Sequence, residues 1–248
     1  MNENEENAVS TTSTITDEVK ALIAASAQEQ AEAEVDTIPF ISPKGKKFTL
    51  GEEKLGNILN VVILADVFDH SYYDRPYDPD TISPPACFAI NTVNSELAPH
   101  VTSPVVQAPS CGECPMNEFG SSSNGKGKAC RNGRRLLVAA VTDGVPDLVN
   151  LAIINLAPTS LKGYAKYAKS LATIKKLPIW AVVTTLSFDD DATWPQIVTN
   201  FNGVLDGNYI NGIAPRLAEF AEAVSVPYDV TNYEAVSSQD NAKKSKMS

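Results

Sequence analysis

The chain has few of the residues from which most catalytic and membrane-spanning sites are built. Its 248 residues include four cysteines, two histidines and two tryptophans. No apolar run reaches the ~20 residues that a transmembrane helix needs, and no nucleophile elbow, HExxH or dinucleotide fingerprint occurs. The polar, acidic first residues are unlike a secretory signal or an arginine-rich transit peptide. We therefore expect a non-enzymatic, cytoplasmic protein without membrane contact.

The sequence also lacks the net positive charge of proteins that bind nucleic acid over their whole surface. Twenty Lys and Arg residues stand against thirty Asp and Glu residues, giving a formal net charge of -10. Much of this excess lies in residues 1–36, where Lys20 is the single base. The remaining body is close to balanced, so a local basic groove stays compatible with the composition.

Composition divides the chain into three stretches. Residues 1–36 predict a disordered acidic arm, although residues 16–34 could form a short helix with Thr16 as its N-cap. Residues 37–230 predict one domain, because the hydrophobic content of 43 % suffices for a core. Residues 231–248 are polar and predict a disordered tail.

Short strands joined by proline-rich loops predict a mainly β (α+β) domain, an open barrel or a sandwich rather than a doubly wound sheet. The pattern predicts a hairpin over residues 38–50 and two helices, over 158–176 and 211–226. Strands are expected over residues 61–64, 87–90, 136–141, 148–157 and 180–188, with a short or edge strand within 194–204.

The four cysteines form the most informative pattern of the chain. Cys111 and Cys114 make a C-x2-C knuckle, Cys130 follows, and Cys87 precedes them. Four thiols with this spacer suit tetrahedral Zn2+, and full thiolate coordination would make the site structural. The ligands can converge only if the strands of Cys87 and Cys130 lie side by side.

Three alternatives to a four-thiolate zinc site remain open. The thiols could form disulfides or stay free and buried, although a reducing compartment favours metal. An iron–sulfur cluster also uses four cysteines, but this spacing matches no standard pattern. His70 or His100 could replace one cysteine, but each is more simply interpreted as a surface histidine in a loop.

A glycine- and lysine-rich loop lies between Cys114 and Cys130 and is the candidate for phosphate binding. Its glycines would let backbone amides approach phosphates, and bases within and just after it would supply charge: Lys126, Lys128, Arg131, Arg134 and Arg135. Residues 120–126 match G-x4-G-K, but Gly127 stands where a Walker A loop needs Ser or Thr. The alternative is a solvated loop whose lysines serve solubility.

A second basic stripe and three aromatics could complete a single-strand site. Lys162, Lys166 and Lys169 recur on one face of the helix expected there, where solvation and the helix dipole are a sufficient explanation. Bases could stack on Tyr72, Tyr73 and Phe119 while the cations neutralise the backbone. The competing interpretation is that the tyrosines pack against the barrel.

Acidic residues offer a further alternative, a metal-dependent nuclease. The cluster comprises Asp66, Asp69, Asp74, Asp78 and Asp80, with a second run at residues 189–191. Neither cluster comes with a positioned lysine or a nuclease motif, and acids between prolines usually form turns. A zinc-stabilised protein-interaction or transcription-regulating module is another alternative.

The run from PPACFAI through CGECPMNEFGS to GKGKACRNGRRLLV resembles phage-type single-stranded DNA-binding proteins. The resemblance covers about residues 39–188. It implies an OB-like barrel, Zn2+ on Cys87, Cys111, Cys114 and Cys130, and a strand-coating role in DNA replication or recombination in a bacterial host cell. Proteins of those processes would be further partners. The chain departs from many single-strand binders because its last residues, AKKSKMS, are basic rather than acidic.

Overall fold

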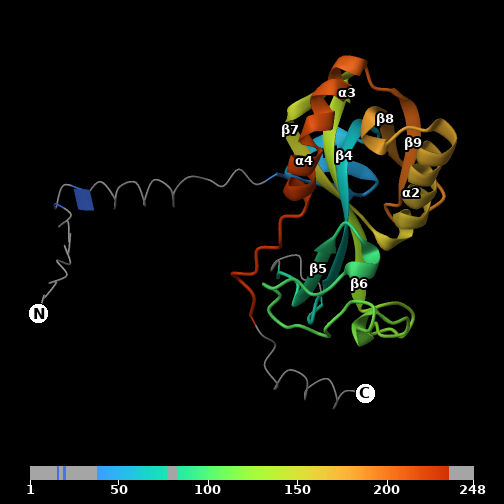
Figure 1. Cartoon of the computed structure of the whole chain (residues 1–248). Coiled ribbons are helices and arrows are strands. Elements are labelled where there is room, and N and C mark those ends of the chain that lie inside the picture. The colour runs from blue at the N-terminus through green and yellow to red at the C-terminus, as the bar shows by residue number, and fades with distance from the viewer. Residues whose placement is uncertain (1–15, 17–18, 21–37, 77–82, 235–248) are drawn as a thin grey trace, which may run out of the picture. The chain divides into compact units, whose positions relative to one another are not determined.

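The computed structural model describes residues 16, 19–20, 38–76 and 83–234. Apart from residues 16 and 19–20, the arm expected over 1–36 lies outside this part, as does most of the tail expected over 231–248. From Ile38 onward the chain forms one compact unit. Its framework is a single nine-stranded sheet that curls into an open half-barrel (Figure 1). The expectation of a mainly β domain with helices is confirmed.

The strands follow one another in the sheet in the order β3-β2-β1-β7-β6-β4-β8-β9, with β5 pairing to β4 off this path. Only the β1–β7 pair is parallel among the strand pairs of the described residues. The strands are β1 (Phe40–Lys44), β2 (Lys47–Leu50), β3 (Glu53–Gly56), β4 (Leu59–Tyr72), β5 (Cys87–Asn91), β6 (Cys130–Thr142), β7 (Val145–Leu156), β8 (Val182–Phe188) and β9 (Ile197–Val204).

Two tight hairpins set the register of the sheet. Gly45 and Lys46 link β1 to β2 with φ of 58° and 53°, and Asp143 and Gly144 link β6 to β7 with φ of 53° and 81°. Two successive left-handed residues match the right-handed twist of the flanking strands. The hairpin expected over residues 38–50 is therefore confirmed.

The central strands β4 and β6 are longer than the sequence predicts. The apolar run indicates only residues 61–64, yet β4 spans fourteen residues. β4 pairs with β6 from Val61 to Tyr72, and β5 pairs with β4 at its far end. This pairing satisfies the backbone of a polar-aromatic stretch that has no hydrophobic periodicity of its own. Both strands therefore extend from the barrel to the cysteine-bearing end (Figure 1).

The two faces of β4 bury different clusters of side chains. Val61 and Ile63 contribute to the interior of the half-barrel, where Phe48 on β2 stacks on Phe188 at 4.5 Å between ring centroids. Val62 and Leu64 face the other side. A register shift between Ile63 and Ala65 places Leu64 in a bulge and resets the alternation for the rest of the strand.

Helices cover both faces of the curled sheet. The helix α2 (Pro158–Ser170) is followed by a π turn η3 (Leu171–Lys175). Its Tyr164 packs in the cluster inside the half-barrel, which we call the inner cluster. The helix expected over residues 211–226 is instead two, α3 (Gly207–Ile213) and α4 (Leu217–Val224), separated by the turn η5 (Ala214–Arg216) that contains Pro215. Phe220 and Val224 of α4 pack in the cluster on the other face of the sheet, which also contains Val62 and Leu64.

Three further short turns are η1 (Asn94–Glu96), η2 (Pro115–Asn117) and η4 (Ile179–Ala181).

Within the described ranges, no helix is long and apolar enough to cross a membrane.

Candidate functional site

The strand ladder brings Cys87 and Cys130 to the two sides of one residue, Tyr72. Tyr72 of β4 is opposite Cys87 of β5 and also opposite Cys130 of β6. Directly opposed residues project from the same face of a sheet, so all three share one face. The sequence led us to expect the strands of the two cysteines side by side, and this is wrong, because β4 lies between them.

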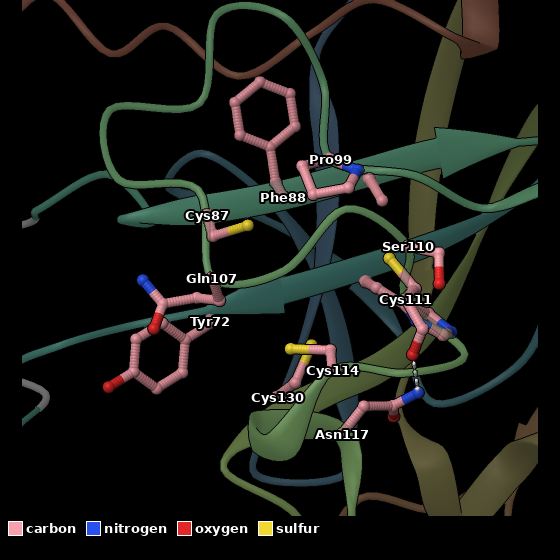
Figure 2. Close-up of a pocket in the computed structure, with 12 residues that line it drawn as sticks. Tyr72, Cys87, Phe88, Pro99, Gln107, Ser110, Cys111, Cys114, Asn117 and Cys130 are labelled. Atoms are coloured by element: carbon pink, nitrogen blue, oxygen red, sulfur yellow. Dashed lines mark hydrogen bonds between the residues drawn. The ribbon is translucent and has the colours of Figure 1, made fainter.

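The knuckle completes a cavity that all four cysteines line. Its volume is about 20 Å3, and His70 and Tyr72 contribute to its wall. Figure 2 shows the four thiols around one shared space, with Cys87 and Cys111 entering from opposite sides. A space of this size holds one water-sized particle. Among the described side chains, no group of three or more His, Cys, Asp or Glu residues is already arranged to hold a metal ion.

The thiols influence one another electrostatically. Burial raises the pKa of Cys111 to about 11, and the neighbouring Cys87 and Cys114 add to the shift. Burial and the other three cysteines raise the pKa of Cys130 to about 12, against a small opposing effect of Lys128. Four thiolates this close would repel one another, so a divalent cation is the partner that would stabilise their charged form.

Asn117 holds the knuckle in place. Its side-chain amide donates to the carbonyl of Cys111 at 2.7 Å, and its backbone N–H donates to the carbonyl of Cys114 at 2.9 Å. The Oδ1 of Asn117 accepts from Lys128 Nζ at 3.1 Å and from Asn132 Nδ2 at 2.9 Å. The loop, the knuckle and β6 are therefore connected through one side chain.

The interpretation of His70 as a surface histidine in a loop is wrong. His70 lies on β4 and is only 5 % exposed, and its Nε2 lies 3.0 Å from Asn132 Nδ2. Burial, reinforced by Lys128 and opposed by Asp69, lowers the pKa of His70 to about 4. A neutral ring whose Nε2 accepts from Asn132 carries its proton on Nδ1. His100 is half-buried and stacks on Phe88 at 5.0 Å.

The glycine-rich loop is held by hydrogen bonds within itself. The amides of Gly120 and Ser122 donate to the carbonyl of Gly127, and the amide of Gly125 donates to the carbonyl of Ser122. The amide of Gly127 donates to Ser122 Oγ. The expectation that these glycines present amides to phosphates is therefore wrong for this conformation. Gly133, which follows Cys130, is buried in β6.

One aromatic side chain of this loop is strongly exposed. Phe119 is 83 % exposed, and Lys128 Nζ lies 5.2 Å from the centre of its ring. Lys126, on the same loop, is also exposed. A large ring in water next to an ammonium group has no packing role, so it is the clearest candidate contact surface of the loop.

No family model, no curated protein and no solved structure matches this chain.

Two of the five expected phosphate-binding bases are held by carboxylates of β4. Arg135 is 2 % exposed, its Nε donates to Asp69 Oδ2 at 3.1 Å, and its guanidinium lies 4.4 Å from the ring of Tyr228. Arg134 forms an ion pair with Asp66 and lies 4.1 Å from the ring of Phe68. Because both charges are already neutralised, we leave both arginines out of the candidate surface.

The other expected contact residues are accessible to different degrees. Arg131 on β6 is exposed, and Tyr73 is 42 % exposed, whereas Tyr72 is half-buried at the cysteine cavity. The three lysines expected on a helix face are all exposed on α2: Lys162, Lys166 and Lys169. The structure thus groups Lys126, Lys128 and Phe119 on one loop and leaves the α2 lysines on a separate element.

The acidic cluster does not converge on one point. Asp66 pairs with Arg134, Asp69 with Arg135 and Tyr228, and Asp74 accepts from Tyr233 at 2.6 Å. Asp78 and Asp80 lie outside the described residues. The described acids each have a different partner, so their geometry gives the nuclease alternative no support.

Sequence reasoning missed the asparagines and one aromatic. Asn117 and Asn132 link the cysteine knuckle to β6, and Phe40 on β1 is 46 % exposed beside Arg131 at one cavity. Isolated amides carry no periodic or motif signal. Phe40 gave a weak one, because it is the aromatic at the start of an expected hairpin.

Proposed function

We propose that this chain binds single-stranded DNA without catalysis, through the basic loop that follows its cysteine knuckle. The observation that carries the proposal is the exposed Phe119 ring with Lys128 against it. Base–aromatic stacking is worth ~1–3 kcal/mol per base, and it needs a free ring near cations. Lys126 and Arg131 are exposed on this loop and at the start of β6, and neither side chain has an ion-pair partner in the described part of the chain.

A rigid loop favours this role. The internal hydrogen bonds and the contacts of Asn117 fix the loop before any ligand arrives, so less conformational entropy is lost on binding. A duplex reader would more often present a basic recognition helix, and the basic loop is not one.

We further propose that one Zn2+ is held by Cys87, Cys111, Cys114 and Cys130. The donor chemistry fits, because four thiols from three segments line one ion-sized cavity. Bound zinc would cross-link the three segments and offset part of the charge of the four thiolates, with no open position for catalysis. The protein's own contribution is to place β5 and β6 on either side of β4 and to hold the knuckle with Asn117.

The curled, open sheet is compatible with an OB-like barrel, and we propose that relationship together with a phage-type role in replication or recombination. What supports it is the coarse architecture and the cysteine–glycine–lysine signature.

The test is a fluorescence-anisotropy titration of the zinc-loaded protein against labelled oligo-dT and a matched duplex, over a range of salt. We expect tighter binding to the single strand, with log affinity falling by about 0.7 per log unit of salt for each phosphate neutralised. Phe119→Ala should weaken binding roughly five- to 150-fold.

The chain offers a matched control in Phe201 on β9, which is 36 % exposed and has Lys175 Nζ 4.0 Å from its ring centre. Phe201→Ala should leave the affinity unchanged. Absence of binding to either nucleic acid at low salt would overturn the proposal, and equal losses in the two variants would overturn the assignment to the loop.

A further inference from the structure

A groove on the barrel lies next to Arg131 and away from the cysteine cavity. Phe40, Ile41, Ser42 and Pro43 of β1 form one wall of a cavity of about 180 Å3, whose lining also includes Arg131, Asn155, Ala157, Pro195 and Ile197. Arg131 and Asn155 also line an adjoining smaller cavity with Ser71 and Tyr228. The two cavities therefore meet at Arg131 and Asn155, and we call them together the Arg131–Asn155 groove.

Three side chains of this groove are chemically unusual for a surface hollow. Phe40 is 46 % exposed, although it lies on a strand that is paired on both sides. Asn155 Oδ1 is buried and has no hydrogen-bond partner. Arg131 is exposed, and its side chain has no ion-pair or hydrogen-bond partner within the described ranges.

Two of these features complement the base of a nucleotide, and the third complements its phosphate. A free ring offers a stacking surface for a base. A buried carbonyl oxygen without a donor costs free energy, and the N–H groups on the edge of a base can supply that donor. A free guanidinium binds phosphate oxygens. The neighbouring Arg135 approaches Phe40 only to 6.0 Å and is already paired with Asp69, so it does not compete for the phosphate.

We propose that the Arg131–Asn155 groove binds one nucleotide of a single strand, with the base against Phe40 and Asn155 and the phosphate at Arg131. This inference rests on the proposed single-strand binding and adds a second, base-contacting position to the loop contact at Phe119. Arg131 is the residue that connects the two, because it follows the cysteine loop in sequence and lines the groove.

The experiment compares Phe40→Ala, Asn155→Leu and Arg131→Gln with the wild-type protein, using labelled oligo-dT and an abasic strand of equal length. Phe40→Ala should weaken oligo-dT binding roughly five- to 150-fold at every salt concentration, and leave abasic binding unchanged. Asn155→Leu should weaken only oligo-dT binding, and it should not lower the melting temperature, because it removes an unsatisfied group. Arg131→Gln should weaken both and reduce the log–log salt slope by about 0.7.

The outcomes separate this inference from the proposed function. If the wild-type protein binds oligo-dT and Phe119→Ala weakens it, while Phe40→Ala and Asn155→Leu change it less than about twofold, the groove is not a nucleotide site and the loop assignment stands. If the wild-type protein binds no single strand, the proposed function itself fails. Selective loss with oligo-dT supports both.

Discussion

Arg135 provides the sharpest test of what the basic residues do, because sequence alone places it in the phosphate-binding set and the structure places it in the core. Its guanidinium bonds to Asp69 at 3.1 Å and to the carbonyl of Val226 at 2.5 Å, and it lies against Tyr228. Arg135→Met should therefore destabilise the fold without changing the affinity for single strands.

The magnitude follows from the carboxylate left behind. Removing one partner of a buried pair costs about 3–5 kcal/mol. In the variant Asp69 keeps its hydrogen bond from the Tyr228 hydroxyl but loses its cation. The loss of unfolding free energy should therefore fall within this range.

The expected loss has a definite structural cause. Arg135→Met lowers stability because Asp69 loses its cation, whereas the accessible loop bases have no such partner in the core.

Urea denaturation followed by tryptophan fluorescence measures the unfolding free energy, and anisotropy titrations under folding conditions measure the affinity for single strands. The matched control is Arg131→Gln on the same strand, which should keep the stability and lose affinity. Wild-type stability in Arg135→Met combined with a salt slope reduced by about 0.7 would refute this reasoning and return Arg135 to the binding surface.

Two further predictions concern the cysteine end and the central strands. The purified protein should contain about one zinc per chain by elemental analysis. Chelation should lower both its melting temperature and its affinity for oligo-dT, because metal ligation contributes folding free energy. Absence of metal, with an unchanged melting temperature after chelation, would exclude the site. Gly133→Ala should cost about 1–3 kcal/mol of unfolding free energy, because its Cβ would lie 3.0 Å from the carbonyl oxygen of Leu156 and 3.3 Å from that of Asp69. Gly163→Ala, with nothing within 4 Å, should instead raise stability by about 0.5–1 kcal/mol, and equal effects of the two substitutions would contradict the steric argument.

Local chemistry made much of the barrel predictable from sequence. The apolar runs within residues 136–141 and 148–157, with the Asp143-Gly144 turn between them, indicate β6 and β7 directly. The second half of β4 could not be predicted in this way. Its polar and aromatic residues are strand residues only because β5 and β6 pair with them on both edges, and pairing between distant segments leaves no local periodic signal.

The candidate site could likewise be predicted only in part from local sequence. The spacing of Cys111 and Cys114 indicates a shared cavity, and the structure brings all four cysteines to it. Charge counting could not separate Arg131 from Arg135, because their difference lies in what packs against them. Tyr228, far along the chain, lies over Arg135, whereas the side chain of Arg131 stays in water.

The bulge at Leu64 means that the number of residues between it and Tyr72 determines the orientation of Tyr72. From that bulge to Tyr72 the residues alternate without interruption, so the count between them decides which face Tyr72 shares with the cysteines. A single insertion there would rotate Tyr72 and His70 to the opposite face. Residues 92–129, which connect β5 to β6 without a strand, carry no such parity. Variation in chain length can therefore accumulate in that connection, while the segment from Ala65 to Tyr72 must keep its number of residues.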